Sequence, residues 1–193
     1  MSKLFTKRTK RLLITAILLL LIGLIPQKEN IKPIIQKAEE NQPGLYTVKV
    51  VSDGDTISVD MNGVVEKVRF IGVDTPETND PRKEVQCFGK AASEFTKKLI
   101  GENTVRLEAD PTNTNRDRYN RLLRYVYLPN GTLVNAEIIK NGYGFAYTNF
   151  PFTKLDEFKK YQEDAKRKNL GLWGSCSVTT ESNGQNQTQD NQN

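Results

Sequence analysis

Residues 46–73 read YTVKVVSDGDTISVDMNGVVEKVRFIGV, and apolar and polar residues alternate in several short runs of this stretch. Alternation with a period of two is typical of strands that bury one face. Two of the runs are joined by Asn62 and Gly63, a pair that strongly favours a two-residue hairpin turn. The stretch therefore predicts roughly three antiparallel strands.

The chain after this stretch predicts two more strands and three helices. The segment FGKAASEFTKKLIG places Ala92, Phe95, Leu99 and Ile100 on one helical face and ends at Gly101, a favoured residue after a helix. Strand patterning returns in TVRLEAD and LLRYVYLPNGTLV, and helical patterning in NAEIIKNG and FTKLDEFKKYQEDAKRKNLGLW. We predict an α+β fold that is mainly β, a five-stranded OB-fold Greek-key barrel with three flanking helices.

The ends of the chain differ in composition from this domain, which we assign to residues 45–176. Residues 1–26 place five basic and no acidic residues beside an apolar run, as export signals do. The apolar run, residues 12–25, would form a helix of roughly 21 Å, shorter than the ~30 Å core of a bilayer, which favours a signal peptide. No small residues in cleavage-site spacing follow it directly, so an uncleaved N-terminal membrane anchor remains the alternative.

Both alternatives predict an extracellular domain, either secreted or anchored to the outer face of the cytoplasmic membrane. Residues 27–44 mix charged residues, Gln and Pro, and we expect them to be a linker. Residues 177–193 lack a hydrophobic repeat, and we expect a disordered tail.

Composition excludes several kinds of chemistry. The chain has no histidine, so acid–base catalysis would depend on carboxylates, Lys, Arg or Tyr. The net charge of +5 comes entirely from residues 1–26, because 23 basic and 23 acidic residues remain elsewhere, so a polyanion would be held by a local cluster. The two cysteines are Cys87 and Cys176, and export favours a disulfide between them over two buried thiols.

Acidic residues gather at the ends of two predicted strands. Asp53 and Asp55 flank a glycine, a pattern that alone is most simply a turn. Asp74 and Glu77 follow the next strand, VRFIGVDTPE, in which Pro76 ends the pairing. Four neighbouring carboxylates would repel one another unless a cation lay among them. Oxygen ligands without His or Cys suit Ca²⁺ or Mg²⁺.

The segment NTNRDRYNRLLRYVYL interleaves arginines with tyrosines. The simpler interpretation is a solvated charge run beside a strand. The alternative is a groove for single-stranded nucleic acid, because guanidinium groups bind phosphate and tyrosine rings stack on bases. One arginine of this segment and Arg69 would then hold a phosphoryl group from two sides. The residues concerned are Arg116, Arg118, Arg121, Arg124, Tyr119 and Tyr125.

Five segments, DGDTISV, VRFIGVDTPE, FGKAASEFTKKL, DRYNRLLRYVYL and LGLW, closely resemble the staphylococcal nuclease family in order and spacing. The resemblance covers residues 45–173. It implies an OB-fold barrel with three helices and Ca²⁺-dependent hydrolysis of DNA and RNA that leaves 3′-phosphate ends.

The resemblance also implies roles for the acidic residues. Asp55, Asp74 and the main-chain oxygen of Thr75 would ligate Ca²⁺, and Asp53 would act through water in the outer shell. Glu77 would be the general base or would orient the attacking water.

The basic and aromatic residues receive roles on the same ground. Arg69 and Arg121 would bind the scissile phosphate and stabilise its transition state. The remaining positions implied to contact substrate are Tyr119, which would contact phosphate, Tyr147, which would stack on the nucleoside, and Lys83 and Arg118 beside the groove. Asn120 stands where the family often has glycine, and asparagine tolerates the positive φ that such a turn needs. A second family tyrosine falls at Asn149 or Phe150, which leaves base preference open.

Together these observations predict an exported Ca²⁺-dependent nuclease acting on DNA and RNA, with single strands favoured. We expect a monomer, and a membrane tether through the N-terminus is the alternative to secretion. The competing prediction is a noncatalytic OB-fold module that binds nucleic acid. The presence of the complete set of acids and arginines favours the enzyme.

Overall fold

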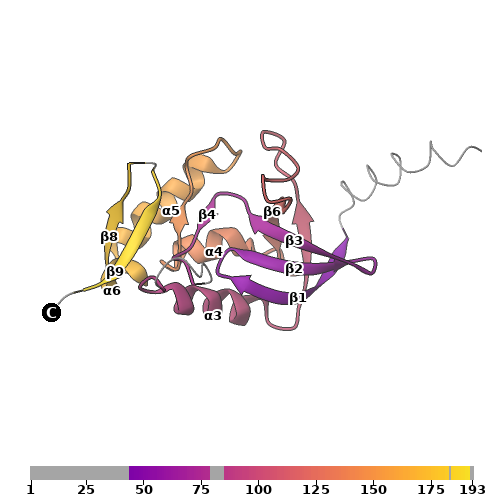
Figure 1. Cartoon of the computed structure of the whole chain (residues 1–193), viewed down its shortest axis with the longest axis horizontal. Helices are drawn as coiled ribbons and strands as arrows, with labels where there is room; N and C mark the ends of the chain where they lie inside the picture. Colours follow the sequence, from indigo (N-terminus) through magenta and orange to yellow (C-terminus); the bar gives the residue numbers. More distant parts are fainter. Residues whose placement is uncertain (1–43, 79–84, 183, 192–193) are drawn as a thin grey trace, which may run out of the picture. The chain divides into compact units, whose positions relative to one another are not determined.

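The computed structural model describes residues 44–78, 85–182 and 184–191 (Figure 1). Five strands form a closed barrel in the order β1-β2-β3-β6-β5. Strands β3 and β6 pair in parallel, and the other neighbours pair antiparallel. The barrel strands are β1 (Leu45–Asp53), β2 (Thr56–Met61), β3 (Val64–Phe70), β5 (Thr104–Glu108) and β6 (Leu122–Tyr127). The predicted α+β fold with a five-stranded barrel is confirmed.

The hairpin between β2 and β3 forms as its sequence predicts. Asn62 and Gly63 both have positive φ, 56° and 88°, as the tightest hairpin turns require. Strand β1 has two register shifts against β2, between Val48 and Val50 and between Val51 and Asp53. Such irregularities increase local twist and bend a strand, which helps a sheet of five strands to close.

Three helices flank the barrel, α3 (Gly89–Ile100), α4 (Val134–Lys140) and α5 (Leu155–Arg167), and a single turn, α6 (Leu172–Ser175), follows them. The predicted number of flanking helices is therefore confirmed. Asn135 in α4 is fully buried, and its side chain accepts a hydrogen bond from Val126 N–H and donates one to the carbonyl of Ile71. This amide satisfies main-chain groups that the barrel leaves unpaired at its junction with the helix.

Helix α3 buries a slightly different face from the predicted one. Ala92 and Ile100 are fully buried, as expected, but the third fully buried side chain is Thr96, whereas Phe95 and Leu99 are only partly buried. The helix ends at Gly101, which has a φ of 57° and whose N–H donates to the carbonyl of Lys97, as predicted for a terminal glycine.

The buried carboxylate of Asp110 joins three segments of the domain through its hydrogen bonds. One oxygen accepts hydrogen bonds from the N–H and the hydroxyl of Thr112, at 2.8 and 2.6 Å. The other accepts from the hydroxyl of Tyr125 in β6 and from the N–H and hydroxyl of Thr153, just before α5, at 2.6 to 2.7 Å. Asp110 therefore fixes the segment after β5 against β6 and the entrance to α5.

A two-stranded sheet pairs β4 (Val73–Asp74) with β7 (Phe145–Ala146), so that Asp74 lies opposite Phe145. This pairing holds the end of the VRFIGVD segment rigidly. It also brings the residues after β7 to the same place, because the N–H of Tyr147 donates to the carbonyl of Gly72 at 2.9 Å.

The expected disorder of residues 177–193 is wrong for the part of this segment that the structure describes. There β8 (Cys176–Thr180) and β9 (Asn186–Asp190) form an antiparallel hairpin, shown in yellow in Figure 1. The hairpin needs no hydrophobic repeat because main-chain hydrogen bonds pair its strands and because it buries few side chains, those of Cys176 and Thr188 and part of Val178. That hydroxyl donates a hydrogen bond of 2.7 Å to the carbonyl of Cys87.

The disulfide favoured by the sequence is present between Cys87 and Cys176, with a Cα–Cα distance of 6.1 Å. Phe145 and Leu172 pack with Cys176 in a small cluster beside the main core. A disulfide indicates a compartment outside the reducing cytoplasm. Within the described ranges no helix is long and apolar enough to cross a membrane. The export segment, residues 1–26, the linker up to residue 43 and Lys83 lie outside those ranges.

Candidate active site

Arg69 lies between two of the predicted ligands and binds both. Its Nη1 is 2.9 Å from Oδ2 of Asp55, and its Nη2 is 2.9 Å from Oδ1 of Asp74. Nη1 also donates to the carbonyl of Val73 at 2.7 Å. The three charged residues come from the turn just before β2, from β3 and from β4, so the fold gathers the strand ends as the sequence predicted.

Asp55 is tied to the loop that follows β4. Its Oδ2 accepts hydrogen bonds from the N–H and the hydroxyl of Thr75, at 2.9 and 3.1 Å. The neighbouring Gly54 packs so closely that a Cβ there would lie 2.7 to 2.9 Å from the Thr75 side chain. Its carbonyl accepts a bond of 2.6 Å from the buried hydroxyl of Thr96 in α3. The aspartate–glycine–aspartate turn is therefore fixed on both sides, and glycine is required at its centre for lack of space.

Asp53 and Glu77 complete a group of four acidic side chains. Asp53 Oδ1 accepts hydrogen bonds from Gly54 N–H at 2.8 Å and from the hydroxyl of Thr78 at 3.3 Å. Burial, followed by the charges of Asp55 and Glu77, raises the pKa of Asp53 to about 6. Glu77 lies beside it, with its Oε1 accepting a 2.9 Å bond from Thr78 N–H.

The four acidic side chains and Arg69 together carry an excess of negative charge. Burial raises the pKa of Asp74; Arg69 opposes this shift, and the other carboxylates add to it. For Arg69, burial would lower the pKa, but Asp55 and Asp74 outweigh burial and raise it, so the guanidinium stays charged. One cation thus serves several acids, an arrangement that attracts a further positive charge.

The donor set suits a hard cation in chemistry, although the side chains are not arranged as a finished metal cage. Among the residues that the structure describes, no three His, Cys, Asp or Glu side chains form a group that could hold a metal ion. Arg69 takes the space between Asp55 and Asp74. The ligands on offer are carboxylate and main-chain oxygens without sulfur or imidazole, the ligand type that hard cations such as Ca²⁺ and Mg²⁺ prefer.

Arg121 lies on a separate loop, where it is paired with Asp117. Oδ2 of Asp117 is 2.7 Å from both Nε and Nη2 of Arg121, and its Oδ1 accepts from the Arg121 N–H at 3.0 Å. The guanidinium also lies 5.3 Å from the centre of the Tyr119 ring, which is 64% exposed, and that of Arg118 lies 4.8 Å from it. Asn120 has a φ of 63°, so the turn keeps the conformation expected of it.

The strand register relates this loop to the acidic group. Arg69 in β3 pairs with Leu123 in β6, and the two strands are parallel. Arg121 comes two residues before Leu123, on the turn that leads into β6. The loop that carries Arg121 therefore leads directly into the strand that pairs with β3.

Three of the residues considered for a nucleic-acid groove serve the fold instead. Arg116 forms two bonds to Glu66, at 2.8 and 3.0 Å. Arg124 is 3% exposed and binds Asn115 through its side chain. Tyr125 is buried and bonded to Asp110, as described above. Among the arginines and tyrosines of this segment, Arg118 and Tyr119 are exposed and Arg121 is half-buried.

Tyr147 follows β7 and lies close enough to Arg69 to contribute to the electrostatics of that guanidinium. Its ring centre is 5.9 Å from that of Phe150, which is 61% exposed. Phe150, rather than Asn149, is therefore the second aromatic side chain beside Tyr147.

Sequence reasoning missed two residues that hold predicted site residues. Asp117 pairs with Arg121, and the signal was its position four residues before that arginine. Gln86 bonds to the main chain of Glu77, and the sequence contains no signal for this contact. A contact across nine residues through an irregular loop has no periodic signature.

Comparisons with known proteins agree with the arrangement. The family described as Staphylococcal nuclease homologue matches residues 67–175. Thermonuclease of Staphylococcus intermedius is 44% identical over 129 residues, which make up 66% of this chain and 75% of that protein. Two proteins of Bacillus subtilis (strain 168) also match. The SPbeta prophage-derived endonuclease YokF is 41% identical over 131 residues, and endonuclease YncB is 39% identical over 145. These matches cover 67% and 73% of this chain, but 44% of YokF and 68% of YncB, so the chain spans less than half of YokF.

Proposed function

The chain belongs to the staphylococcal nuclease family, and from this premise we propose that it is an exported, Ca²⁺-dependent nuclease that hydrolyses phosphodiester bonds of DNA and RNA to 3′-phosphate products. The single observation that carries the proposal is Arg69 held between Asp55 and Asp74, with Asp53 and Glu77 beside them. A charged arginine within a group of acids is better explained by a site that processes phosphate than by a purely structural role.

Arg69 and Arg121 are proposed to bind the scissile phosphate. Arg69 lies on β3 and Arg121 on the loop that leads into the paired strand β6, and we propose that they hold a phosphoryl group from two sides, since guanidinium groups bind its oxygens bidentately. Each arginine is held by carboxylates in the free protein, Arg69 by Asp55 and Asp74 and Arg121 by Asp117. These partners keep both guanidinium groups oriented before substrate arrives, and such preorganised charge stabilises a transition state efficiently.

Glu77 is proposed to orient the attacking water and to accept its proton. Its carboxylate lies next to the acids of the site, and its main chain is held at both the N–H and the carbonyl by Gln86. Proton acceptance by a positioned carboxylate typically contributes 10² to 10⁴-fold to rate.

Asp55, Asp74 and the main-chain oxygen of Thr75 are proposed to hold Ca²⁺, with Asp53 acting through water. When bound, the ion supplies positive charge that offsets the developing charge on the phosphate. The proposal is supported by the gathering of four carboxylates, whose repulsion adds to burial in raising the pKa values of Asp53 and Asp74 and would be relieved by a cation.

We propose that the substrate runs from Tyr119, on the loop that carries Arg121, to Tyr147 and Phe150, which follow β7. Tyr119 and Arg118 would contact phosphate, and Tyr147, with Phe150, would stack on an exposed base. Lys83 is proposed to add a basic contact. Because stacking requires an unpaired base, single strands are favoured, and we propose that the enzyme acts as a monomer.

The proposal is tested by hydrolysis of single-stranded DNA with the purified full-length chain in Ca²⁺, in Mg²⁺ and in chelator. Glu77→Ala and Arg121→Ala are expected to abolish most of the Ca²⁺-dependent cleavage. Arg106→Ala is the matched control, since Arg106 also pairs with an acid, Glu108, and covers a tyrosine ring, that of Tyr127, but in the barrel wall. Salt-sensitive binding without cleavage under any metal would instead support a noncatalytic module.

Location is tested separately. The disulfide supports an extracytoplasmic site of action. Mass spectrometry of the protein isolated from culture medium and from membranes would give its mature N-terminus. Loss of residues 1–26 would support secretion, and an intact N-terminus in the membrane fraction would support a tether.

A further inference from the structure

We propose that Gln86 is a positioning residue for Glu77, and that the disulfide and the C-terminal hairpin hold Gln86 in place. The inference rests on the proposed function, because it assigns to Gln86 the task of fixing the proposed catalytic glutamate. It also gives a role to two features that the reaction itself does not use, the covalent bond at Cys87 and the hairpin formed by β8 and β9.

Gln86 binds the main chain of Glu77 twice. Its side-chain Oε1 accepts a hydrogen bond from the N–H of Glu77 at 3.1 Å, and its own N–H donates to the carbonyl of Glu77 at 3.0 Å. Both main-chain polar groups of Glu77 are therefore held by one residue. Because the Glu77 side chain is attached to this main chain, the two hydrogen bonds fix the point from which its carboxylate extends.

The start of α3 packs directly against the same segment. The N–H of Gly89 donates to the carbonyl of Gln86 at 3.0 Å, which closes a turn over residues 86–89. A Cβ on Gly89 would lie 3.0 Å from the carbonyl oxygens of Pro76 and Glu77 and 2.7 Å from the Thr78 side chain. The turn and the glutamate segment thus touch without space for adjustment, and a displacement of the turn moves Glu77 with it.

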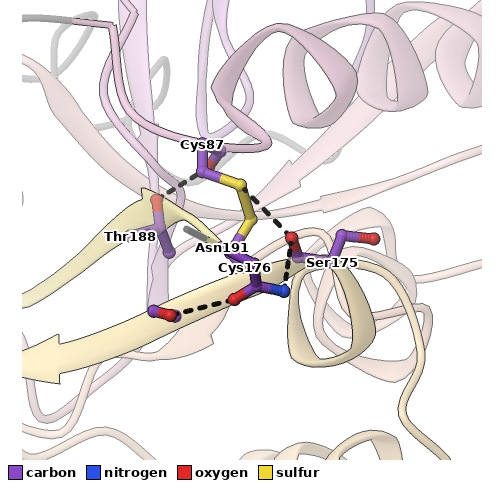
Figure 2. The surroundings of a disulfide bond; sticks show 6 residues. Cys87, Ser175, Cys176, Thr188 and Asn191 are labelled. Atoms are coloured by element: carbon purple, nitrogen blue, oxygen red, sulfur yellow. Dashed lines mark hydrogen bonds between the residues drawn. A yellow bond between two sulfur atoms is a disulfide. The ribbon is translucent and has the colours of Figure 1, made fainter. Parts of the chain in front are cut away.

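Cys87 lies inside this turn, and the C-terminal segment binds the turn at this residue. Figure 2 shows the disulfide to Cys176 together with the hydrogen bond from the Thr188 hydroxyl to the carbonyl of Cys87. The same view shows Asn191 donating to the carbonyl of Ser175, which joins the end of the hairpin to the last turn of helix. The residue next to Gln86 is therefore held by one covalent bond and by one buried hydroxyl.

The physical consequence is a chain of contacts that leads from the C-terminal hairpin through Cys87 and Gln86 to Glu77. Catalytic rates are sensitive to small errors of position, and a displacement of about 1 Å can cost on the order of 10²-fold. Loss of one hydrogen bond in this chain is expected to cost less than removal of Glu77 and to act on turnover rather than on substrate binding.

The test uses Gln86→Met, which keeps the length of the side chain and removes the acceptor, and Gln86→Glu, which keeps the acceptor. In the full-length protein, Q86M is expected to lower kcat about tenfold with less than about twofold change in KM. Q86E is expected to restore part of the loss, because it keeps the acceptor but adds a negative charge beside the acidic group. Asn130→Ala is the control, because Asn130 also accepts a main-chain N–H, that of Thr132, but in a turn of the barrel far along the chain from the site.

A double-mutant cycle separates positioning from general stability. In a Glu77→Ala background, Q86M is expected to cause no further loss of kcat, because its effect passes through the Glu77 carboxylate. An equal loss in both backgrounds, or a loss of kcat that follows a lower melting temperature, would overturn the inference. If E77A itself retains full activity, the proposed function fails, whereas full activity in Q86M with an inactive E77A defeats only this inference.

The contribution of the hairpin is tested by Thr188→Val, which removes the hydroxyl and keeps the volume of the side chain. A loss of kcat of about threefold without a change in KM is expected, since the disulfide still holds Cys87. Wild-type kcat in both T188V and the Cys87→Ser/Cys176→Ser double variant would show that neither supports Gln86, and would overturn that half of the proposal.

Discussion

Replacement of Asp110 by Asn is expected to destabilise the protein by about 3 kcal/mol at pH 7. The carboxylate accepts five hydrogen bonds from Thr112, Tyr125 and Thr153, and it is only 4% exposed. Asparagine keeps one acceptor oxygen and turns an NH₂ group toward the remaining donors. At least two of these donors then lose their partner, and each buried group left unsatisfied costs roughly 1 to 3 kcal/mol.

The pH dependence of this loss can be worked out from the same contacts. Burial alone would raise the pKa of Asp110, but the donors from Thr112, Tyr125 and Thr153 outweigh it and hold that pKa well below the usual range. A carboxyl group with a lowered pKa stabilises the fold above its unfolded pKa of about 3.9, and this contribution falls as the pH falls. Between pH 7 and pH 3 the wild type loses about 1.3 kcal/mol through this group, and D110N cannot lose it. The difference in unfolding free energy between the wild type and D110N should therefore be about 1.3 kcal/mol smaller at pH 3 than at pH 7.

Urea unfolding of both proteins at pH 7 and pH 3, followed by tryptophan fluorescence, measures the two differences. Asp190→Asn, at an exposed aspartate of β9, is the control and should change stability by less than about 0.5 kcal/mol. A loss below about 1 kcal/mol at pH 7, or a difference that does not narrow at pH 3, would refute the role given to these hydrogen bonds.

Three further predictions concern the site and its support. Arg121→Ala should lower kcat by roughly 10² to 10³ with little change in binding, and Asp117→Asn should cost about tenfold because the guanidinium loses its orientation; equal losses of kcat and binding in R121A would contradict the role in turnover. Ca²⁺ should raise the melting temperature less at pH 5 than at pH 8, because Asp53, whose pKa is about 6, takes up a proton and no longer attracts the ion. Calorimetric scans measure this rise, and an equal rise at both pH values would contradict a role of Asp53 in attracting Ca²⁺. Removal of the disulfide through Cys87→Ser/Cys176→Ser, which opens a loop of 89 residues, should destabilise by up to about 4 to 5 kcal/mol, and unchanged chemical unfolding would refute that estimate.

Local chemistry accounts for the parts of the fold that were predicted correctly. The Asn62–Gly63 turn, the alternating strands and Gly101 at the end of α3 depend on residues that are neighbours in the chain, so the sequence contains their whole cause. The acids at the strand ends were also found from sequence, because strands that pair as a hairpin bring their ends to the same edge.

Other features depend on which surfaces the fold covers, and no local pattern carries that information. Arg124 and Tyr125 have the composition of a binding groove, yet both are buried, because Arg124 binds Asn115 and Tyr125 packs in the main core and binds Asp110. The disorder predicted after residue 176 is wrong for the described residues for the same reason, because the hairpin is held by a contact with Cys87, which lies far away in the chain.

The division between sequence and tertiary structure is therefore one of distance. The sequence alone determined the strands, their turns and the residue types of the site, since each follows from propensities and spacings within a few positions. Only the tertiary structure decided that Arg69 bridges Asp55 and Asp74 and that a C-terminal hairpin reaches Cys87, 101 residues before Thr188. Such contacts form only after the chain has paid the entropy of closing long loops, and their energy comes from packing that the local sequence does not encode.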